Sequence, residues 1–256
     1  MCETCGCAVT PESRTVEVLT DLLQANDRQA DENRRRLGEH GLLGINLMSS
    51  PGAGKTSLLE ATLGPEPARA AVIEGDLATE RDADRLRRRG IDAIQITTGS
   101  ACHLDASMVA AAMDGLALDG RDYLFIENVG NLVCPASFDL GQHLNVVLLS
   151  VPEGDDKPAK YPVMFRAADL VLVTKADLWP HCAEFSVERV RSRLHDLARD
   201  VPVIEVSARS GAGLKQWKDW LEQAVVRNGQ RLARGEHRRP AIQSDGARAH
   251  GLTAEA

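Results

Sequence analysis

The sequence has no hydrophobic run long enough to cross a membrane and no excess of positive charge. None of its apolar stretches approaches the roughly 18 consecutive residues of a spanning helix, and the formal net charge is -7 over 256 residues. Proteins that bind nucleic acid or anionic lipid favour a basic surface. We therefore expect neither nucleic acid nor a membrane among its partners.

The sequence also lacks a secretory signal, because no basic stretch followed by an apolar stretch opens the chain. This predicts a cytoplasmic protein. Thiols stay reduced in the cytoplasm, so the six cysteines are expected to bind metal or to serve catalysis rather than to form disulfides. Three of them, Cys2, Cys5 and Cys7, lie within the first seven residues.

Two runs of arginine, at residues 34–36 and 87–89, have acidic residues close by in the sequence. Mixed charge of this kind is typical of solvated helix faces. We interpret both runs in that way and not as anion-binding sites.

Four segments follow one another along the chain. Residues 1–10 form a cysteine-rich, metal-binding tail, and residues 11–43 form a helix and a linker, with the helical pattern over 15–37. Residues 44–227 form the main domain. Residues 228–256 are polar, rich in glycine and alanine and without apolar periodicity, which predicts a disordered tail.

The main domain alternates apolar runs with helical patterns. The apolar runs are residues 44–50, 70–76, 92–99, 122–130, 144–151, 169–177 and 201–208. The helical patterns lie at residues 56–63, 80–89, 104–118, 186–197 and 214–226. This alternation predicts an α/β fold, a doubly wound and mostly parallel sheet with helices on both faces. Ligands of such folds bind beyond the carboxyl ends of the strands.

The stretch SSPGAGKTS, residues 49–57, follows the first strand and opens a helix. It fits the P-loop pattern G-x-x-x-x-G-K-[ST] except at its first position, where Ser49 replaces glycine. The loop directs backbone N–H groups at phosphate oxygens, while Lys55 reaches the β- and γ-phosphates and Thr56 binds Mg²⁺. The expected nucleotide-binding residues here are Gly52, Ala53, Gly54, Lys55, Thr56 and Ser57.

Two later strand ends predict a guanine nucleotide, GTP or GDP. The stretch VTKAD resembles the N-K-x-D guanine motif, with Thr174 in place of asparagine, and Asp177 can accept two hydrogen bonds that only guanine donates. Lys175 would cover the base. Ser207 and Ala208 resemble the loop whose backbone N–H meets the guanine oxygen.

Carboxylates for the magnesium ion are expected at two other strand ends. Asp76 follows the second strand and Glu127 the fourth, where they join Thr56 around a nucleotide metal. Asp82 is a weaker candidate, Asp76 has the alternative role of a helix N-cap, and Gly130 can donate its N–H to the γ-phosphate. The expected catalytic residues are Lys55, Asp76 and Glu127.

A second group of candidate ligands is softer. Cys102 and His103 are adjacent just before a helix, and Cys134 follows another strand end on the same rim of the sheet. Thiolate and imidazole suit nickel or zinc, with water or a second copy of the chain completing the site. The alternative is a buried thiol at Cys134 and a helix-start hydrogen bond at His103. Cys182 is interpreted as incidental.

Cys134 lies four residues beyond Gly130. A γ-phosphate that attracts the N–H of Gly130 would pull this segment and would also move Cys134. The sequence therefore predicts that nucleotide state and metal affinity are coupled.

These stretches together resemble the HypB family of hydrogenase nickel-incorporation GTPases, a SIMIBI-class P-loop family. The likeness rests on CxxCxC at the start, SSPGAGKTSLL, EGDLATERDADR, TGSACHLDASM, ENVGNLVCPA, EGDDKPAKYPVMF and TKAD, from residue 1 to about 226. It implies a GTPase that assists nickel insertion into [NiFe] hydrogenase, a GTP- and metal-linked homodimer, a HypA-type partner and, indirectly, the hydrogenase large-subunit precursor.

The resemblance also carries over site residues. It implies nickel or zinc at Cys102, His103 and Cys134, and nickel at a tail site of Cys2, Cys5 and Cys7. Lys157 and Lys160 become candidates for contacting nucleotide from the opposite subunit. The seven histidines are scattered, so no nickel-storage segment is expected.

Two other functions compete with nickel delivery. One is a metal-sequestering or metal-sensing protein with vestigial hydrolysis, in which metal binding does not respond to nucleotide. The other is a small-metabolite P-loop kinase, which the guanine-type TKAD stretch disfavours because most such kinases use ATP. Intrinsic GTP hydrolysis is expected to be slow, since no arginine is placed as a finger within the chain.

The N-terminal thiols generate the first testable prediction. A redox role needs Cys-x-x-Cys at a rigid helix start. Three thiolates on a flexible tail instead suit a metal ion that the protein captures and then transfers. Deleting residues 2–7 is expected to remove the tightest nickel site and to leave GTP hydrolysis intact. Nickel titration and phosphate release on the same preparations check this, and loss of hydrolysis on deletion would contradict it.

Overall fold

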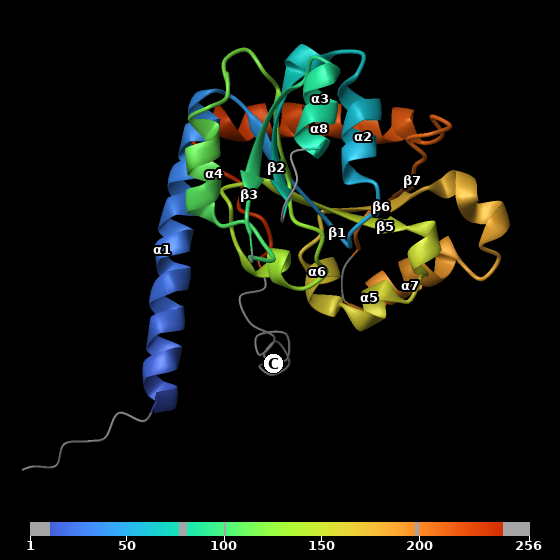
Figure 1. Cartoon of the computed structure of the whole chain (residues 1–256), viewed down its shortest axis with the longest axis horizontal. Helices are drawn as coiled ribbons and strands as arrows, with labels where there is room; N and C mark the ends of the chain where they lie inside the picture. Colours follow the sequence, from blue (N-terminus) through green and yellow to red (C-terminus); the bar gives the residue numbers. More distant parts are fainter. Residues whose placement is uncertain (1–10, 77–80, 100, 198–199, 243–256) are drawn as a thin grey trace, which may run out of the picture.

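The computed structural model describes residues 11–76, 81–99, 101–197 and 200–242 (Figure 1). Cys2, Cys5 and Cys7, the predicted tail site, lie outside the described residues. None of the helices in the described ranges is both long enough and apolar enough to span a bilayer.

A seven-stranded sheet forms the centre of the domain. Its strands are β1 Leu43–Ser49, β2 Ala70–Asp76, β3 Asp92–Thr97, β4 Tyr123–Glu127, β5 Leu144–Ser150, β6 Leu170–Thr174 and β7 Val203–Glu205. They are ordered β3-β2-β4-β1-β5-β6-β7, and every pairing is parallel. The predicted α/β, doubly wound sheet is confirmed, with all seven strands parallel.

Helices cover both faces of this sheet (Figure 1). They are α1 Pro11–Glu39, α2 Lys55–Leu63, α3 Arg81–Arg88, α4 Ala106–Met113, α5 Lys157–Lys160, α6 Pro162–Arg166, α7 Val187–Asp196 and α8 Leu214–Leu232, with four 3-10 turns, η1 Pro67–Arg69, η2 Cys134–Ser137, η3 Val151–Glu153 and η4 Ala176–His181. Helices α2, α3 and α8 bury apolar residues on one face. Helices α6 and α7, and α1 with α4, cover the other.

Strand β1 lies between β4 and β5, so the chain leaves it in one direction to β2 and later returns to its other side. This reversal of direction opens a crevice at the carboxyl end of β1, where ligands of doubly wound folds bind. The P-loop follows β1 directly and therefore lies in that crevice.

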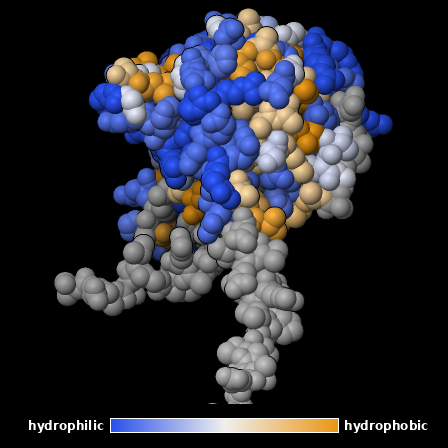
Figure 2. All heavy atoms as spheres, turned by 90° about the vertical axis from the view of Figure 1, so that its left-hand side faces the viewer, coloured by the Kyte–Doolittle hydropathy of each residue, from blue (hydrophilic) through white to orange (hydrophobic). Residues whose placement is uncertain are grey.

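Helix α1 is longer than predicted, and it contacts α4 along part of its length. Its N-terminal turns extend beyond the body of the domain (Figure 1). The side of the molecule that carries α1 is largely hydrophilic, with apolar residues in small separate groups (Figure 2).

The prediction that residues 34–36 form a solvated face is wrong for Arg34. Its side chain is 2% exposed, and it donates to both carboxylate oxygens of Asp139 at 2.6 Å and to Asp31 at 2.8 Å. The helical period places position 34 on the same side as the buried residues Ala30 and Leu37. Arg35, one residue on, is 54% exposed. Residues 87–89 are exposed, as predicted.

Helix α8 continues six residues past its predicted end at residue 226. Asn228, which is buried, donates to the carbonyl of Leu42 at 3.1 Å and thereby holds these last turns against the start of β1. The chain beyond the helix forms an ion pair between Arg238 and Asp169, and the carbonyl of Ala241 accepts from Asn145 at 3.2 Å. The disordered tail expected from residue 228 therefore does not begin there, and residues 243–256 lie outside the described ranges.

Replacement of Arg34 by alanine is expected to lower the free energy of unfolding by about 3–5 kcal/mol, because it leaves Asp139 buried without its cation. Arg35→Ala on the solvent side of the same helix is the matched control and should leave unfolding nearly unchanged. Urea denaturation of the three proteins measures the difference, and equal midpoints for the two variants would refute the assignment.

Candidate functional site

The P-loop connects β1 to α2 and has the backbone geometry that phosphate binding needs. Gly52 and Gly54 have φ angles of 73° and 97°, a region that other residues rarely adopt. The Lys55 side chain is 7% exposed and its Nζ donates to the hydroxyl of Ser49 at 3.1 Å. The serine that replaces the first glycine of the pattern thus contacts the lysine directly.

A cavity of about 380 Å³ lies over this loop. Most of the predicted phosphate and magnesium residues line it, although they come from four different segments. They are Gly52, Gly54, Lys55, Thr56, Ser57, Asp76, Asp82, Glu127 and Gly130, and Lys175, predicted to cover the base, lines the cavity as well. Ala53 of the P-loop lines a neighbouring cavity instead.

Helix α2 and strand β4, which border this cavity, supply oxygen ligands for a hard cation. The Thr56 hydroxyl donates to Glu127 Oε1 at 2.9 Å, and Glu127 is 4% exposed. Its second oxygen, Oε2, has no hydrogen-bond partner. Burial raises the pKa of Glu127, while Lys55 and Thr56 oppose that rise. A buried carboxylate with an open oxygen beside a threonine hydroxyl fits Mg²⁺.

The carboxylates here stand apart from one another. No three acidic groups of the described residues bring their oxygens within 4.8 Å. A wide arrangement of this kind suits Mg²⁺, which usually keeps several water ligands and binds nucleotide phosphates.

One acidic residue of this cavity was missed in the sequence. Glu74 is 3% exposed, lines the cavity, and has no partner for its Oε2. Burial, together with the charges of Glu127, Asp82 and Asp76, raises its pKa to about 8, against the attraction of Lys55. The period of a strand gives the missing signal, because Glu74 and Asp76 differ by two residues and so lie on one face.

The predicted base-binding residues surround a second cavity, of about 350 Å³, lined by Ala53, Thr174, Lys175, Asp177 and Ala208, among others. Ser207 donates to Asp177 Oδ1 at 2.6 Å and so fixes that carboxylate. The buried hydroxyl of Thr174 donates to the carbonyl of Ala53 at 2.7 Å. Thr174, which stands where the guanine motif has asparagine, therefore ties the base loop to the P-loop.

Lys175 has a φ of 56°, the one positive φ at a non-glycine position in the described ranges. Such a conformation costs of order 1–3 kcal/mol and occurs where surrounding contacts enforce it, often at ligand sites. The bonds of Thr174 and Asp177 on either side of Lys175 enforce it here.

Cys102, His103 and Cys134 come together although 32 residues separate the two cysteines. The two sulfurs lie 3.1 Å apart, and Cys102 Sγ lies 3.7 Å from His103 Nδ1. One ligand atom from each residue falls within 4.8 Å of the others, in a half-buried position. The imidazole of His103 stacks on Phe138 at 3.9 Å, which orients the ring.

The protonation states of this group favour a soft divalent metal at neutral or higher pH. Burial lowers the pKa of His103, so the ring is neutral and able to bind metal. The hydrogen bond with Cys102, and then burial, raise the pKa of the Cys134 thiol. A metal must therefore displace thiol protons, and its affinity rises with pH.

The alternative interpretation of these residues does not fit the geometry. The N-cap of α4 is Asp105, whose side chain accepts from the N–H of Met108, so His103 does not cap that helix. Cys134 is half-buried at the start of η2 and is not a fully buried thiol.

The remaining sequence candidates lie elsewhere. Lys157 and Lys160 both pair with Asp156 in their own loop and line a groove of about 740 Å³ rather than the nucleotide cavities. Cys182 packs beside the apolar cluster of α6 and α7 and shares that groove with His181.

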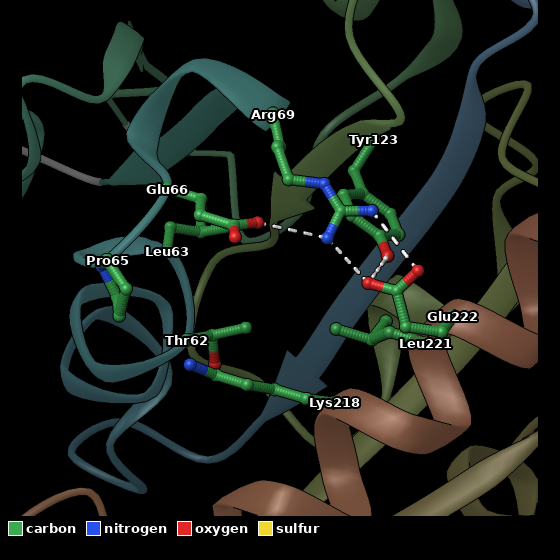
Figure 3. Close-up of a pocket in the computed structure, with 9 residues that line it drawn as sticks. All are labelled: Thr62, Leu63, Pro65, Glu66, Arg69, Tyr123, Lys218, Leu221 and Glu222. Atoms are coloured by element: carbon green, nitrogen blue, oxygen red, sulfur yellow. Dashed lines mark hydrogen bonds and ion pairs between the residues drawn. The ribbon is translucent and has the colours of Figure 1, made fainter.

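A smaller cavity of about 230 Å³ lies at the amino edge of the sheet (Figure 3). Its guanidinium, Arg69, already pairs with Glu66, Glu222 and Asp122. Tyr123 donates to Glu222 at 3.5 Å on the same side. These pairs hold η1 and β4 against α8 and engage the guanidinium of this cavity, which Lys218 also lines.

Comparison with known proteins adds to this geometry. Residues 44–205 match the family described as CobW/HypB/UreG, nucleotide-binding domain. The chain is 53% identical over 215 residues to the hydrogenase maturation factor HypB of Azotobacter chroococcum, covering 82% of this chain and 70% of that protein. It is 50% identical over 213 residues to HypB of Escherichia coli K12, covering 82% and 73%.

Two solved structures are similar. A crystal structure of HypB from Helicobacter pylori in complex with nickel is 47% identical, with a TM-score of 0.76, covering 80% of this chain and 96% of that one. HypB from Archaeoglobus fulgidus is 37% identical, with a TM-score of 0.72, covering 79% and 100%.

The raised pKa of Glu74 predicts a pH dependence of stability in nucleotide-free, metal-free protein. Between about pH 4.5 and 8 the folded state binds more protons at Glu74 than the unfolded state, so stability falls as pH rises. Glu74→Gln should flatten this slope and stabilise the protein at pH 8 by roughly 1–3 kcal/mol, at about 1.4 kcal/mol per pKa unit.

Urea denaturation from pH 5 to 8.5 measures the slope. Glu184→Gln, at an exposed position, controls for the loss of one negative charge. A Glu74→Gln slope that matches the wild type would contradict the assignment.

Proposed function

Because the chain belongs to the HypB family of hydrogenase maturation factors, we propose that it is a GTP-hydrolysing metallochaperone. It binds nickel and assists the insertion of nickel into the active site of a [NiFe] hydrogenase. Metal affinity and dimerisation respond to nucleotide state. The cytoplasm is the proposed location.

One observation carries this proposal more than any other. The thiol and imidazole group of Cys102, His103 and Cys134 lies at the same carboxyl edge of the sheet as the P-loop. Soft ligands of this type suit nickel or zinc, and the similar Helicobacter pylori HypB is a complex with nickel. A nucleotide site and a transition-metal site on one rim support a function that uses both.

The nucleotide half of the site supports GTP over ATP. A carboxylate that meets guanine through two hydrogen bonds is left unpaired by adenine, which penalises ATP strongly. Asp177 is the proposed carboxylate, and its bond from Ser207 and its position beside Lys175 in the second cavity support this role. Backbone N–H groups of the P-loop hold the phosphates.

For hydrolysis, Lys55 binds the β- and γ-phosphates, and Asp76 and Glu127 orient the cation together with Thr56. Mg²⁺ supplies the positive charge that neutralises the phosphates during transfer. Glu127 holds the Thr56 hydroxyl in place, and Gly130 lines the same cavity, where its N–H is the proposed donor to the γ-phosphate. Arg85 also lines the cavity, but its guanidinium pairs with Asp82 and Glu60. An arginine held in this way is not a free finger, which supports a slow intrinsic rate.

The metal half of the site has three protein ligands, and a fourth comes from water or from a second copy of the chain. Val133, next to Cys134, is 54% exposed, one of three large apolar side chains so exposed in the described ranges. An exposed apolar residue beside an incomplete ligand set supports a homodimer across this edge. A HypA-type protein is the proposed partner in the maturation of the hydrogenase large subunit.

The competing function is metal sequestration or sensing with vestigial hydrolysis. It predicts the same three ligands but no response of metal affinity to nucleotide. The short path from Glu127 to Cys134 favours coupling, because only six residues lie between the proposed magnesium carboxylate and the proposed thiol ligand.

The test is a competition titration with nickel and zinc in the presence of GDP or a non-hydrolysable GTP analogue. We expect the nickel affinity of the Cys102, His103 and Cys134 site, the weaker of the two predicted nickel sites, to differ between the two nucleotides by about 5- to 150-fold, the usual range of coupling between sites. Cys102→Ala should weaken this site by at least roughly 10- to 100-fold and leave the tighter site predicted for residues 2–7 unchanged. Cys182→Ala, which changes a half-buried cysteine away from the group, should match the wild type.

The same preparations are assayed for phosphate release from GTP and ATP. GTP should be hydrolysed slowly and ATP far less. Equal nickel affinity with both guanine nucleotides would favour sequestration or sensing instead, and preference for ATP would overturn the GTPase assignment.

A further inference from the structure

A single buried amide connects the magnesium side of the site to the nickel or zinc side. Asn128 directly follows Glu127 and is 1% exposed. Its Oδ1 accepts from the backbone N–H of Leu104 at 3.3 Å and from that of Val129 at 3.0 Å. Its Nδ2 donates to Asn46 Oδ1 at 3.2 Å.

Each of these partners belongs to a different functional segment. Leu104 directly follows His103, so a movement of its backbone also moves the proposed metal ligands. Val129 directly precedes Gly130, which lines the nucleotide cavity and is the proposed N–H donor to the γ-phosphate. Asn46 lies in β1, the strand that leads into the P-loop. One side chain thus contacts the metal loop, the loop after β4 and the strand below the phosphates.

Close packing on both sides makes these contacts stiff. A Cβ at Gly130 would lie 2.7 Å from Pro51 Cα, so the loop after β4 presses against the P-loop backbone. The side chain of Leu104 is fully buried against Gly75, where a Cβ would lie 2.9 Å from Leu104 Cδ1. Neither segment can move without displacing its neighbour.

Loss of the bond to Leu104 would also be costly. A buried N–H without an acceptor costs about 1–3 kcal/mol. When the loop after β4 shifts, the Leu104 N–H therefore either follows the amide or finds another acceptor. Both outcomes move the backbone next to His103.

We propose that Asn128 is a positioning residue that transmits nucleotide state to the metal ligands. A nucleotide-dependent shift of residues 127–130 carries the Asn128 amide, the amide carries the Leu104 N–H, and His103 and Cys102 move relative to Cys134. This inference rests on the proposed coupling of nucleotide and metal, and it names the side chain through which that coupling acts.

The experiment measures one ratio, the nickel affinity with GDP divided by that with a non-hydrolysable GTP analogue. In the wild type this ratio should differ from 1 by about 5-fold or more. In Asn128→Ala it should approach 1, with a smaller change in nickel affinity in the GDP state. Asn128→Asp, which keeps an oxygen for the Leu104 N–H, should restore most of the wild-type ratio.

Asn46→Ala is the matched control. It removes the acceptor of Asn128 Nδ2 at an equally buried position, together with a 3.4 Å bond from Asn46 to Asn145, but keeps Asn128 Oδ1, which accepts from the Leu104 N–H. We expect it to keep the wild-type ratio. An equal loss of the ratio in Asn46→Ala and Asn128→Ala would show general loosening of the core and would overturn the proposal.

Hydrogen exchange on the wild-type protein tests the proposal even if the variants do not fold. Hydrogen exchange at the Leu104 amide, resolved by NMR, should differ between the GDP and GTP-analogue states, since its acceptor moves. Identical exchange in both states would overturn the proposal.

The coupling of nucleotide to metal and the role of Asn128 in it are tested separately. A wild-type ratio of 1 would end the proposed coupling and this inference together. A wild-type ratio that persists unchanged in Asn128→Ala would overturn the role of Asn128 alone.

Discussion

The hydrogen bond from the Thr56 hydroxyl to Glu127 joins the start of α2 to the end of β4. It fixes a carboxylate that is 4% exposed, in an interior where the charge would otherwise be unstable. The chain beyond Glu127 then passes Asn128 and Gly130 before it reaches Cys134. The geometry of both candidate sites therefore depends on how this one carboxylate is held.

The parallel sheet explains why so much chemistry gathers on one edge. Every strand presents its carboxyl end to the same side, so the segments after β1, β2, β3, β4 and β6 converge there. Convergence also concentrates negative charge: Glu74, Asp76, Asp82, Glu127 and Lys55 line one cavity, and their charges act on Glu74 although the carboxylates are spaced apart. Clustered carboxylates are stabilised by bound protons or cations. This is consistent with a site for magnesium, which in turn binds nucleotide phosphates.

The amino edge of the sheet serves stability. Arg69 joins η1 to α8, and Arg238 pairs the segment after α8 with Asp169, which precedes β6. Arg34 instead anchors α1 to Asp139, next to Phe138, which stacks on His103. The long N-terminal helix is therefore secured close to the proposed metal ligands, whereas the segment after α8 is secured at the amino edge.

The sequence by itself determined the strands, the P-loop and the guanine-type loop, because periodicity and short motifs are local properties. It also predicted Cys102, His103 and Cys134 as one group of candidate ligands, and the structure brings these three side chains together. It did not reveal that Arg34 is buried, that Glu74 faces Asp82 and Glu127, or that Asn128 holds Leu104. Only the tertiary structure decided these, because each depends on contacts between segments that are distant in the chain, and burial and charge at such contacts have no local signature.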